Sequence, residues 1–257
     1  MTKTLLALAA LAAAIPAQAA LTAGDIAIIG RVNNGSPDSF AFVALNDIAA
    51  GEIVYFTDNG WNGSAFRGST TTDGDGNENF TKWTAAATIS AGTIVSSTAA
   101  GFTTSGGIAG STGGAYASLA LGQGGEQIYA FQNSNASNPL FNVATQTHLF
   151  VFDDTNGFEA ATSSSTGGVA TGLTLGQTAI TFNAATGGGF SVKASVLASG
   201  SKTKEQWLTT FADAANWQAG SLPTGSIAVS AVPEPESYAM MLAGLLAVGA
   251  IARRRRG

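Results

Sequence analysis

The run Ser39-Phe-Ala-Phe-Val-Ala-Leu45 and the run Ile53-Val-Tyr-Phe-Thr57 decide the fold class of this chain. Both are rich in aromatic and β-branched residues, which favour strands. The compact connection Asn46 to Gly51 separates them, and the earlier run Asp25 to Gly30 is a third strand of the same kind. The chain therefore opens as antiparallel β structure.

Short apolar runs of this type continue along the chain, separated by stretches rich in Gly, Ser, Thr and Asn. We predict further strands at residues 80–84, 92–96, 116–121, 127–131, 148–152, 173–175, 178–182 and 190–196. The segment Gly101 to Gly114 is predicted as a surface loop. About ten short strands at regular spacing indicate a sandwich or a barrel.

One segment departs from the strand pattern. Trp207, Leu208 and Phe211 form an amphipathic stripe behind Thr203, which is a good helix N-cap. We predict one short helix near residues 203–214. The turn-rich residues from Gly220 onward then begin a linker, placed at residues 223–232.

Composition excludes several classes of function. The 257 residues contain no Cys, so a disulfide framework, a thiolate metal site and a Cys nucleophile are all excluded. Without the two ends described next, the chain keeps six basic and fourteen acidic residues, a formal charge of −8. Such a body should repel nucleic acid.

Residues 1–19 have the pattern of a secretory signal peptide. Lys3 is the positive residue, Leu5 to Ile15 the apolar region, and Ala17-Gln18-Ala19 the small-residue cleavage site. We therefore expect export through the Sec translocon and cleavage by signal peptidase. The body is assigned to residues 20–222.

The C-terminal end, residues 233–257, contains three ordered features. These are the tripeptide Pro233, Glu234 and Pro235, the apolar segment 238–252, and a basic end made of Arg253, Arg254, Arg255 and Arg256. About 15 apolar residues rise about 22 Å as a helix, and flanking residues that snorkel extend this toward the ~30 Å hydrocarbon core of a bilayer. Four Arg would hold the C-terminus on the cytoplasmic side.

This tail resembles the PEP-CTERM sorting signal of Gram-negative bacteria. The resemblance implies recognition by exosortase, a membrane protease that processes the tail. It also implies an inner-membrane intermediate and a final place at the envelope surface or in the extracellular matrix. The alternative is a permanent membrane anchor that contains Pro-Glu-Pro by chance.

The body is similar to a module of secreted bacterial proteins. The similarity rests on Gly24-Asp25, on Tyr55-Phe-Thr-Asp-Asn-Gly-Trp61, on Gly124-Gly125-Glu126-Gln127 and on Asn216-Trp217. It implies a β-sandwich and transfers no established activity. We therefore predict a mainly β protein: a β-sandwich of about ten short antiparallel strands with one short helix, a signal helix before it and a transmembrane helix after it.

A calcium site is predicted at Asp73, Asp75 and Asn77, because oxygen ligands two residues apart on a turning backbone can converge on one hard cation. The loop departs from an EF-hand, since Glu78 stands where the sharp-turn Gly belongs and Thr84 where the bidentate Glu would be. A solvated acidic loop is the alternative.

Trp61 and Phe66 are candidate ligand-binding residues, because an exposed aromatic pair can stack on sugar rings. Alternatively, Trp61 caps one end of the core, where we also place Trp83 and Trp217. The only His, His148, lies in an apolar run without a nucleophile elbow, so we expect a structural role. Paired carboxylates of the glycosidase type leave no sequence spacing and stay open.

These observations predict a non-enzymatic surface or matrix protein whose body serves adhesion or association with exopolysaccharide. One alternative is a secreted hydrolase acting on phosphoester or glycosidic bonds, with a metal at Asp58, Asp73 or Asp75. A third is an ice-binding protein, although the Thr and Ser residues form no regular T-x-T ladder.

Overall fold

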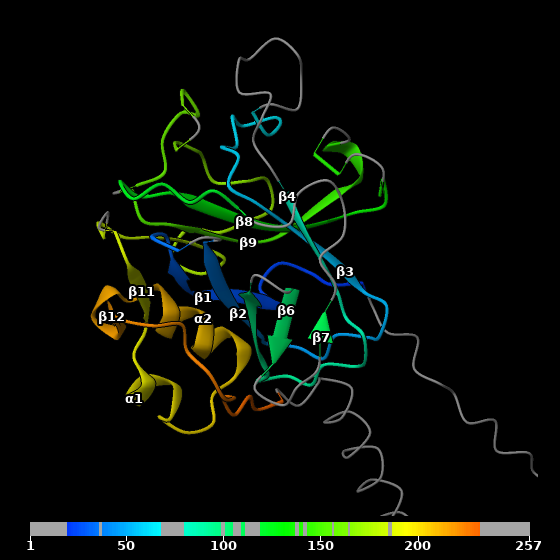
Figure 1. The fold of residues 1–257 in the computed structure, drawn as a ribbon. Coiled ribbons are helices and arrows are strands. Elements are labelled where there is room, and N and C mark those ends of the chain that lie inside the picture. The colour runs from blue at the N-terminus through cyan, green and yellow to red at the C-terminus, as the bar shows by residue number, and fades with distance from the viewer. Residues whose placement is uncertain are drawn as a thin grey trace, which may run out of the picture.

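The structure is a computed structural model that describes residues 20–35, 38–67, 80–98, 101–104, 109–110, 119–136, 139–140, 143–155, 157–163, 165–184 and 187–231. Within these ranges two β-sheets pack face to face, with their strands crossing, so the predicted β-sandwich is confirmed (Figure 1). The predicted signal helix, the loop around Asp73 and the predicted transmembrane helix lie outside the described residues.

The larger sheet has seven strands in the order β12-β11-β1-β2-β5-β6-β7, and all its pairings are antiparallel. The strands are β1 (Ile26–Val32), β2 (Ser39–Ala44), β5 (Ile94–Thr98), β6 (Gly101–Thr104), β7 (Ala109–Gly110), β11 (Gly189–Val192) and β12 (Trp217–Ala219). Strands β6 and β7 correct the prediction of a loop from residue 101. The Gly-rich composition concealed Phe102, which is buried and packs against Phe40 and Phe56.

The smaller sheet has five strands in the order β10-β9-β8-β3-β4. They are β3 (Ile53–Thr57), β4 (Phe80–Thr84), β8 (Gln127–Asn133), β9 (Gln146–Asp153) and β10 (Ala179–Thr181). Strand β10 runs parallel to β9, which corrects the prediction of antiparallel strands throughout. After β9 the chain passes through residues 157–173 before it forms β10 beside β9. A hairpin would make the two strands antiparallel, whereas this long connection lets them run parallel.

The main core fills the space between the sheets. Strand β3 places Val54 and Phe56 on this inner face, and Phe56 contacts Phe40 and Phe42 at ring-centroid distances of 4.7 and 5.2 Å. Trp83 and Trp217 are 1% and 4% exposed, so their assignment to the core is confirmed. Successive side chains of β3 point to opposite faces of the sheet, so Tyr55 between Val54 and Phe56 points to the outer face.

A second apolar cluster covers the outer face of the five-stranded sheet. Tyr55, Tyr129 and Phe131 point outward from β3 and β8, and loops of residues 58–67 and 157–173 fold over them. The hydroxyl of Tyr129 donates to the carbonyl of Gly168 at 2.7 Å and so fastens one loop to the sheet. The central part of this sheet is therefore buried on both faces, which explains the continuous apolar runs within β3, β8 and β9.

Helix α2 (Lys204–Ala212) confirms the predicted helix and its N-cap. Thr203 Oγ1 accepts from the N–H of Gln206, and the Gln206 side chain accepts from the N–H of Thr203, which makes a capping box. The shorter helices are α1 (Ala194–Leu197), η1 (Val143–Thr145) and η2 (Ala214–Asn216). Helix α1 takes residues that we had predicted as the end of a strand.

Two predicted strands are wrong in the parts described. Residues 119–121 and 173–175 have no regular strand structure, although Leu119 and Leu121 are buried. Leu173 is partly buried against the outer apolar cluster and Leu175 is 62% exposed, so the apolar pattern of residues 173–175 predicted neither the backbone nor full burial.

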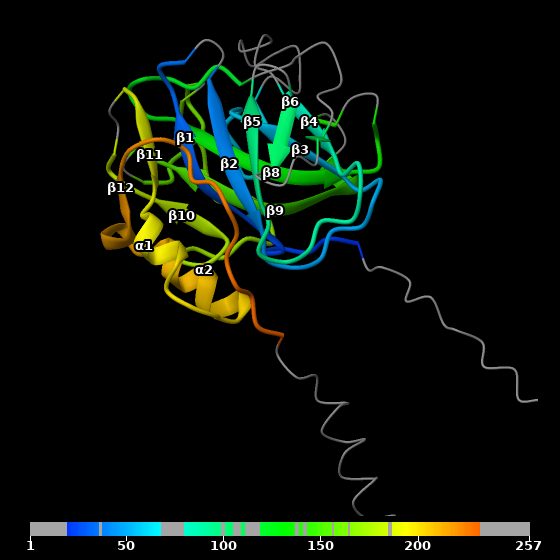
Figure 2. The same ribbon diagram turned by 60° about the horizontal axis from the view of Figure 1, so that its bottom comes forward.

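Residues 223–230, which we predicted as a linker, pack against the body. Ile227 is 6% exposed and donates its N–H to the carbonyl of Gly92 at 2.9 Å, and Ser230 donates to the carbonyl of Lys202 at 2.8 Å. The body thus extends to Ser230. Figure 2 shows this segment, coloured orange, running beside α1 and α2 at one end of the sandwich.

Across the described ranges, the helices are too short or too polar to cross a membrane.

Candidate functional site

Trp61 and Phe66 do not form an exposed platform, which corrects that prediction. They are 1% and 0% exposed, and their rings pack edge to face at 5.1 Å. Phe66 also contacts Tyr129 and Phe131 in the outer apolar cluster. The ring faces that would stack on a sugar instead cover the sheet. The alternative interpretation, in which Trp61 packs as part of the core, is therefore correct.

His148 lies on β9 beneath this loop and has the structural role that we expected. Its Nδ1 is 3.0 Å from the carbonyl oxygen of Thr171 and donates to it, and its ring packs against Trp61 at 4.6 Å. Burial lowers the pKa of His148, although the Thr171 carbonyl acts in the opposite direction. The Nε2 atom of His148 is buried without a hydrogen-bond partner, and the ring also contacts Phe66 at 5.8 Å.

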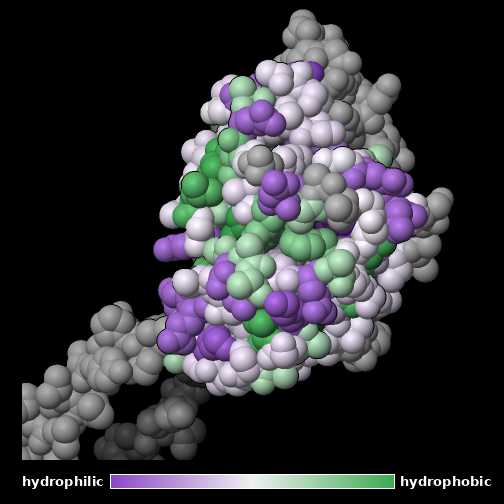
Figure 3. All heavy atoms as spheres, turned by 90° about the vertical axis from the view of Figure 1, so that its left-hand side faces the viewer, coloured by the Kyte–Doolittle hydropathy of each residue, from purple (hydrophilic) through white to green (hydrophobic). Residues whose placement is uncertain are grey.

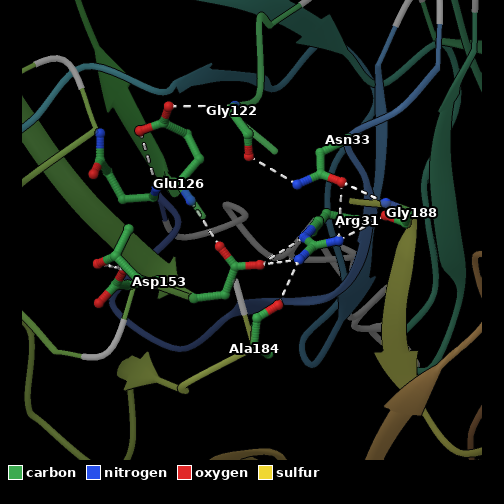
Figure 4. A network of polar contacts seen from close by, with 10 residues as sticks. Arg31, Asn33, Gly122, Glu126, Asp153, Ala184 and Gly188 are labelled. Atoms are coloured by element: carbon green, nitrogen blue, oxygen red, sulfur yellow. Dashed lines mark hydrogen bonds and ion pairs between the residues drawn. The ribbon is translucent and has the colours of Figure 1, made fainter. Parts of the chain in front are cut away.

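A buried ion pair joins the two sheets where β1 and β9 end. Nε and Nη2 of Arg31 both donate to Oδ2 of Asp154, at 2.7 Å from Nε, and the two side chains are 2% and 1% exposed. Nη1 donates to Asn33 Oδ1 and the Gly188 carbonyl, and Nη2 donates to the Ala184 carbonyl (Figure 4). All five guanidinium N–H groups thus have acceptors, so this network ties β1, β9 and β11 together and leaves no donor for a ligand.

This network was not predicted from the sequence. Arg31 is a charged residue inside the apolar strand Ile26–Val32, which was the available signal that a buried partner existed. The partner could not be identified from the sequence, because Asp154 is 123 residues away along the chain.

Three carboxylates hold the segment 120–122 by accepting from successive backbone N–H groups. Oδ2 of Asp58 accepts from Ala120 at 2.8 Å, Oδ2 of Asp38 accepts from Leu121 at 2.8 Å, and Oε2 of Glu126 accepts from Gly122 at 3.4 Å. Burial raises the pKa of Asp58 to about 6, and the negative charge of Asp38 adds to the shift. Burial also raises the pKa of Asp38.

Asp58 and Asn59 carry the unpaired polar atoms of this region. Oδ1 of Asp58 and both side-chain heteroatoms of Asn59 have no hydrogen-bond partner, and the residues are 1% and 0% exposed. Buried polar groups are normally paired, because an unpaired one costs about 1–3 kcal/mol. A cation or a small polar ligand would satisfy these oxygens.

The predicted calcium ligands Asp73, Asp75 and Asn77 lie outside the described residues. In the part of the chain that the structure describes, no three His, Cys, Asp or Glu residues are grouped so that they could hold a metal ion. Asp58 is thus the single residue of the predicted metal set whose surroundings are visible.

A surface cavity of about 410 Å³ lies between β11, β12, α1 and residues 220–226. Its polar groups come from Ser191, Gln218, Ser221, Thr224 and Ser226, its apolar walls include Leu197 and Leu222, and no charged residue lines it. Figure 3 shows this side of the molecule, where green apolar areas alternate with white and purple polar ones. Neutral hydroxyl and amide groups beside apolar walls suit an uncharged polar ligand.

The C-terminal end defines the class of the protein. Residues 231–256 match the family model of the PEP-CTERM protein-sorting motif, which includes Pro233, Glu234, Pro235, the segment 238–252 and Arg253 to Arg256. The chain is therefore an exported protein sorted through the membrane, and its motif implies processing by an exosortase, which is a membrane protein. These tail residues lie outside the described ranges. No curated protein and no solved structure matched the chain.

Proposed function

We propose that the sorting system delivers this protein to the envelope surface or the extracellular matrix of a Gram-negative bacterium, where its body acts as a non-enzymatic adhesion or exopolysaccharide-binding module. The observation that carries the binding part is the uncharged cavity between β11, β12 and α1. A glycan presents hydroxyl groups and apolar ring faces, and the cavity offers hydroxyl and amide groups beside Leu197 and Leu222.

The charge of the chain supports an uncharged glycan over an acidic one. Residues 20–232 carry six basic and fourteen acidic residues, a formal charge of −8, which repels an anionic polymer. A neutral polysaccharide meets no such repulsion. The non-enzymatic assignment is supported by Arg31, whose guanidinium donors are all used within the fold.

The binding proposal is tested by titrating the full chain in detergent with neutral and with acidic extracellular polysaccharide fractions. Gln218 and Ser226 are exposed, so Gln218→Ala and Ser226→Trp should weaken binding of the neutral fraction without unfolding the body. Ala160→Trp, on an exposed loop away from the cavity, is the matched control. Equal binding by all variants would overturn the assignment of the cavity.

A second candidate is a metal-dependent hydrolase, favoured by the unpaired oxygens of Asp58 and Asn59. Calorimetric titration with calcium, comparing the unmodified chain with Asp58→Asn and with Asp73→Ala and Asp75→Ala, separates the two candidates. Absence of binding heat in the unmodified chain would leave the hydrolase without support. Heat that disappears in Asp58→Asn would place a cation in the body.

A further inference from the structure

Residues 226–230 determine how far the sorting tail can extend from the body. Thr93 and Ser226 form an antiparallel bridge, and Lys202 and Val229 form a parallel one. Nε1 of Trp207 donates to the carbonyl of Ala228 at 3.0 Å. This docked segment holds the chain to the start of α2 as far as Ser230, three residues before Pro233.

The reach of the remaining chain follows from covalent geometry. Seven residues, and so eight Cα–Cα steps, separate Ser230 from Tyr238, where the apolar segment begins. Even fully extended they span at most ~28 Å. When the apolar segment is in a membrane, the end of the body near Lys202 must therefore lie close to the lipid surface.

The C-terminal part of the body, which lies near the tether, is more positively charged than the rest. Residues 187–231 contain three Lys and two acidic residues, a formal charge of +1, whereas residues 20–186 contain three basic and twelve acidic residues, a formal charge of −9. All three Lys, at positions 193, 202 and 204, are partly exposed. The positive side chains of the body are thus concentrated in the C-terminal part that includes the docked segment.

Strand β1 spans the distance between the end of the body that carries Lys204 and the end that carries Asp38 and Asp58. Lys204 pairs with Asp25 at 3.0 Å, just before β1 begins, while Arg31 near its end contacts Asp154. Asp38 and Asp58 hold the neighbouring segment 120–122. Six residues of strand separate Asp25 from Arg31, which is about 20 Å.

We propose that, while the tail is in the membrane, the end of the body formed by residues 199–204 and 226–230 faces lipid headgroups and the end that carries Asp38 and Asp58 faces away. The inference rests on the proposed delivery through the tail. The short tether prevents the body from turning over, and an anionic lipid surface attracts Lys202 and Lys204 at this end.

The absence of Cys makes a direct test possible, because each introduced thiol is unique. Ala228 lies in the docked segment and Ala160 in the loop of residues 157–163, and both are exposed. In Figure 1 the loop lies at the top and the docked segment at the bottom. Ala228→Cys and Ala160→Cys are labelled with a donor dye in the full chain, which is reconstituted into vesicles of phosphatidylcholine and phosphatidylglycerol with acceptor-labelled headgroups.

Energy transfer should be about twofold higher from position 228, because the two labels differ in distance from the lipid by on the order of 20 Å. Equal transfer in a chain that floats with the vesicles would overturn the orientation alone. A chain that does not float would overturn the delivery proposal and this one with it.

Insertion of about ten Gly and Ser residues after Ala231 should reduce the difference in energy transfer between the two positions. A difference that the insertion leaves unchanged would contradict the role of the tether.

Discussion

Ile227 and Gly92 approach each other too closely for any side chain at position 92. The N–H of Ile227 donates to the carbonyl of Gly92 at 2.9 Å, and a Cβ at Gly92 would stand 2.0 Å from the carbonyl oxygen of Ile227. The φ of Gly92 is +91°, which also favours glycine. The end of the described chain is therefore clamped to the start of β5.

Gly92→Ala should undock this segment and destabilise the protein. Gly51 is the matched control, because its φ is +88° and an added Cβ would have nothing within 4 Å. Gly51→Ala should cost about 1–2 kcal/mol for the left-handed conformation alone. Gly92→Ala should cost roughly twice as much, since the clash is with backbone. Urea unfolding of both variants measures this, and equal losses would contradict the clamp.

Arg31→Met should lower the free energy of unfolding by about 3–5 kcal/mol, because it leaves the buried carboxylate of Asp154 without its partner. Asp154→Leu should have a similar effect for the converse reason. The double variant Arg31→Met with Asp154→Leu should recover much of the loss, since no buried charge then remains unpaired. Additive losses in the double variant would show that the pair is not coupled.

The fold could be predicted from the sequence to the extent that it depends on local pattern. Thr203 is the predicted N-cap, and Gln206, three residues later, completes a capping box with it. The aromatic strands around Phe42 and Phe56 lie in the predicted core. These features need no knowledge of distant residues.

The parts that could not be predicted depend on contacts between distant segments. Arg31 and Asp154 meet across 123 positions, and β10 joins β9 in parallel only because residues 157–173 cross the outer face. Trp61 was read as a possible surface group because its sequence does not reveal the loop that packs it against His148. The sequence shows polar residues at Asp58 and Asn59. It does not show that their side chains are buried with unpaired atoms.

Trp61→Ala should destabilise the protein by about 3–5 kcal/mol, because it removes a buried ring that packs against Phe66 and His148. Thermal or chemical unfolding gives the value, with the exposed Ser64→Ala as a control. Removal of an exposed ring would cost little unfolding free energy. A loss below about 1 kcal/mol would indicate that Trp61 is not core.

Asp58→Asn should change how stability depends on pH. The pKa of Asp58 rises from 3.8 to about 6 on folding, so the folded state binds the proton more tightly than the unfolded state. The resulting stability is fully present below pH 3.8 and is lost as the pH rises to about 6. The loss amounts to about 3 kcal/mol at most.

Asparagine keeps an acceptor for the N–H of Ala120 and carries no charge, so the variant should be more stable than the unmodified protein at neutral pH and should not lose stability over this interval. Urea unfolding between pH 4 and pH 7 measures the difference. Asp47→Asn, at an exposed position, reports the effect of removing one negative charge alone. Parallel pH profiles for the two variants would refute the assignment to Asp58.

The central claim is that the C-terminal end directs this protein to its destination. The most direct measurement compares the full chain with a chain that lacks Pro233 to Gly257, expressed in a host that contains an exosortase, by fractionating envelope and medium. We expect the deletion to change the partition between envelope and medium while the body stays folded. An identical distribution of the two chains would contradict it.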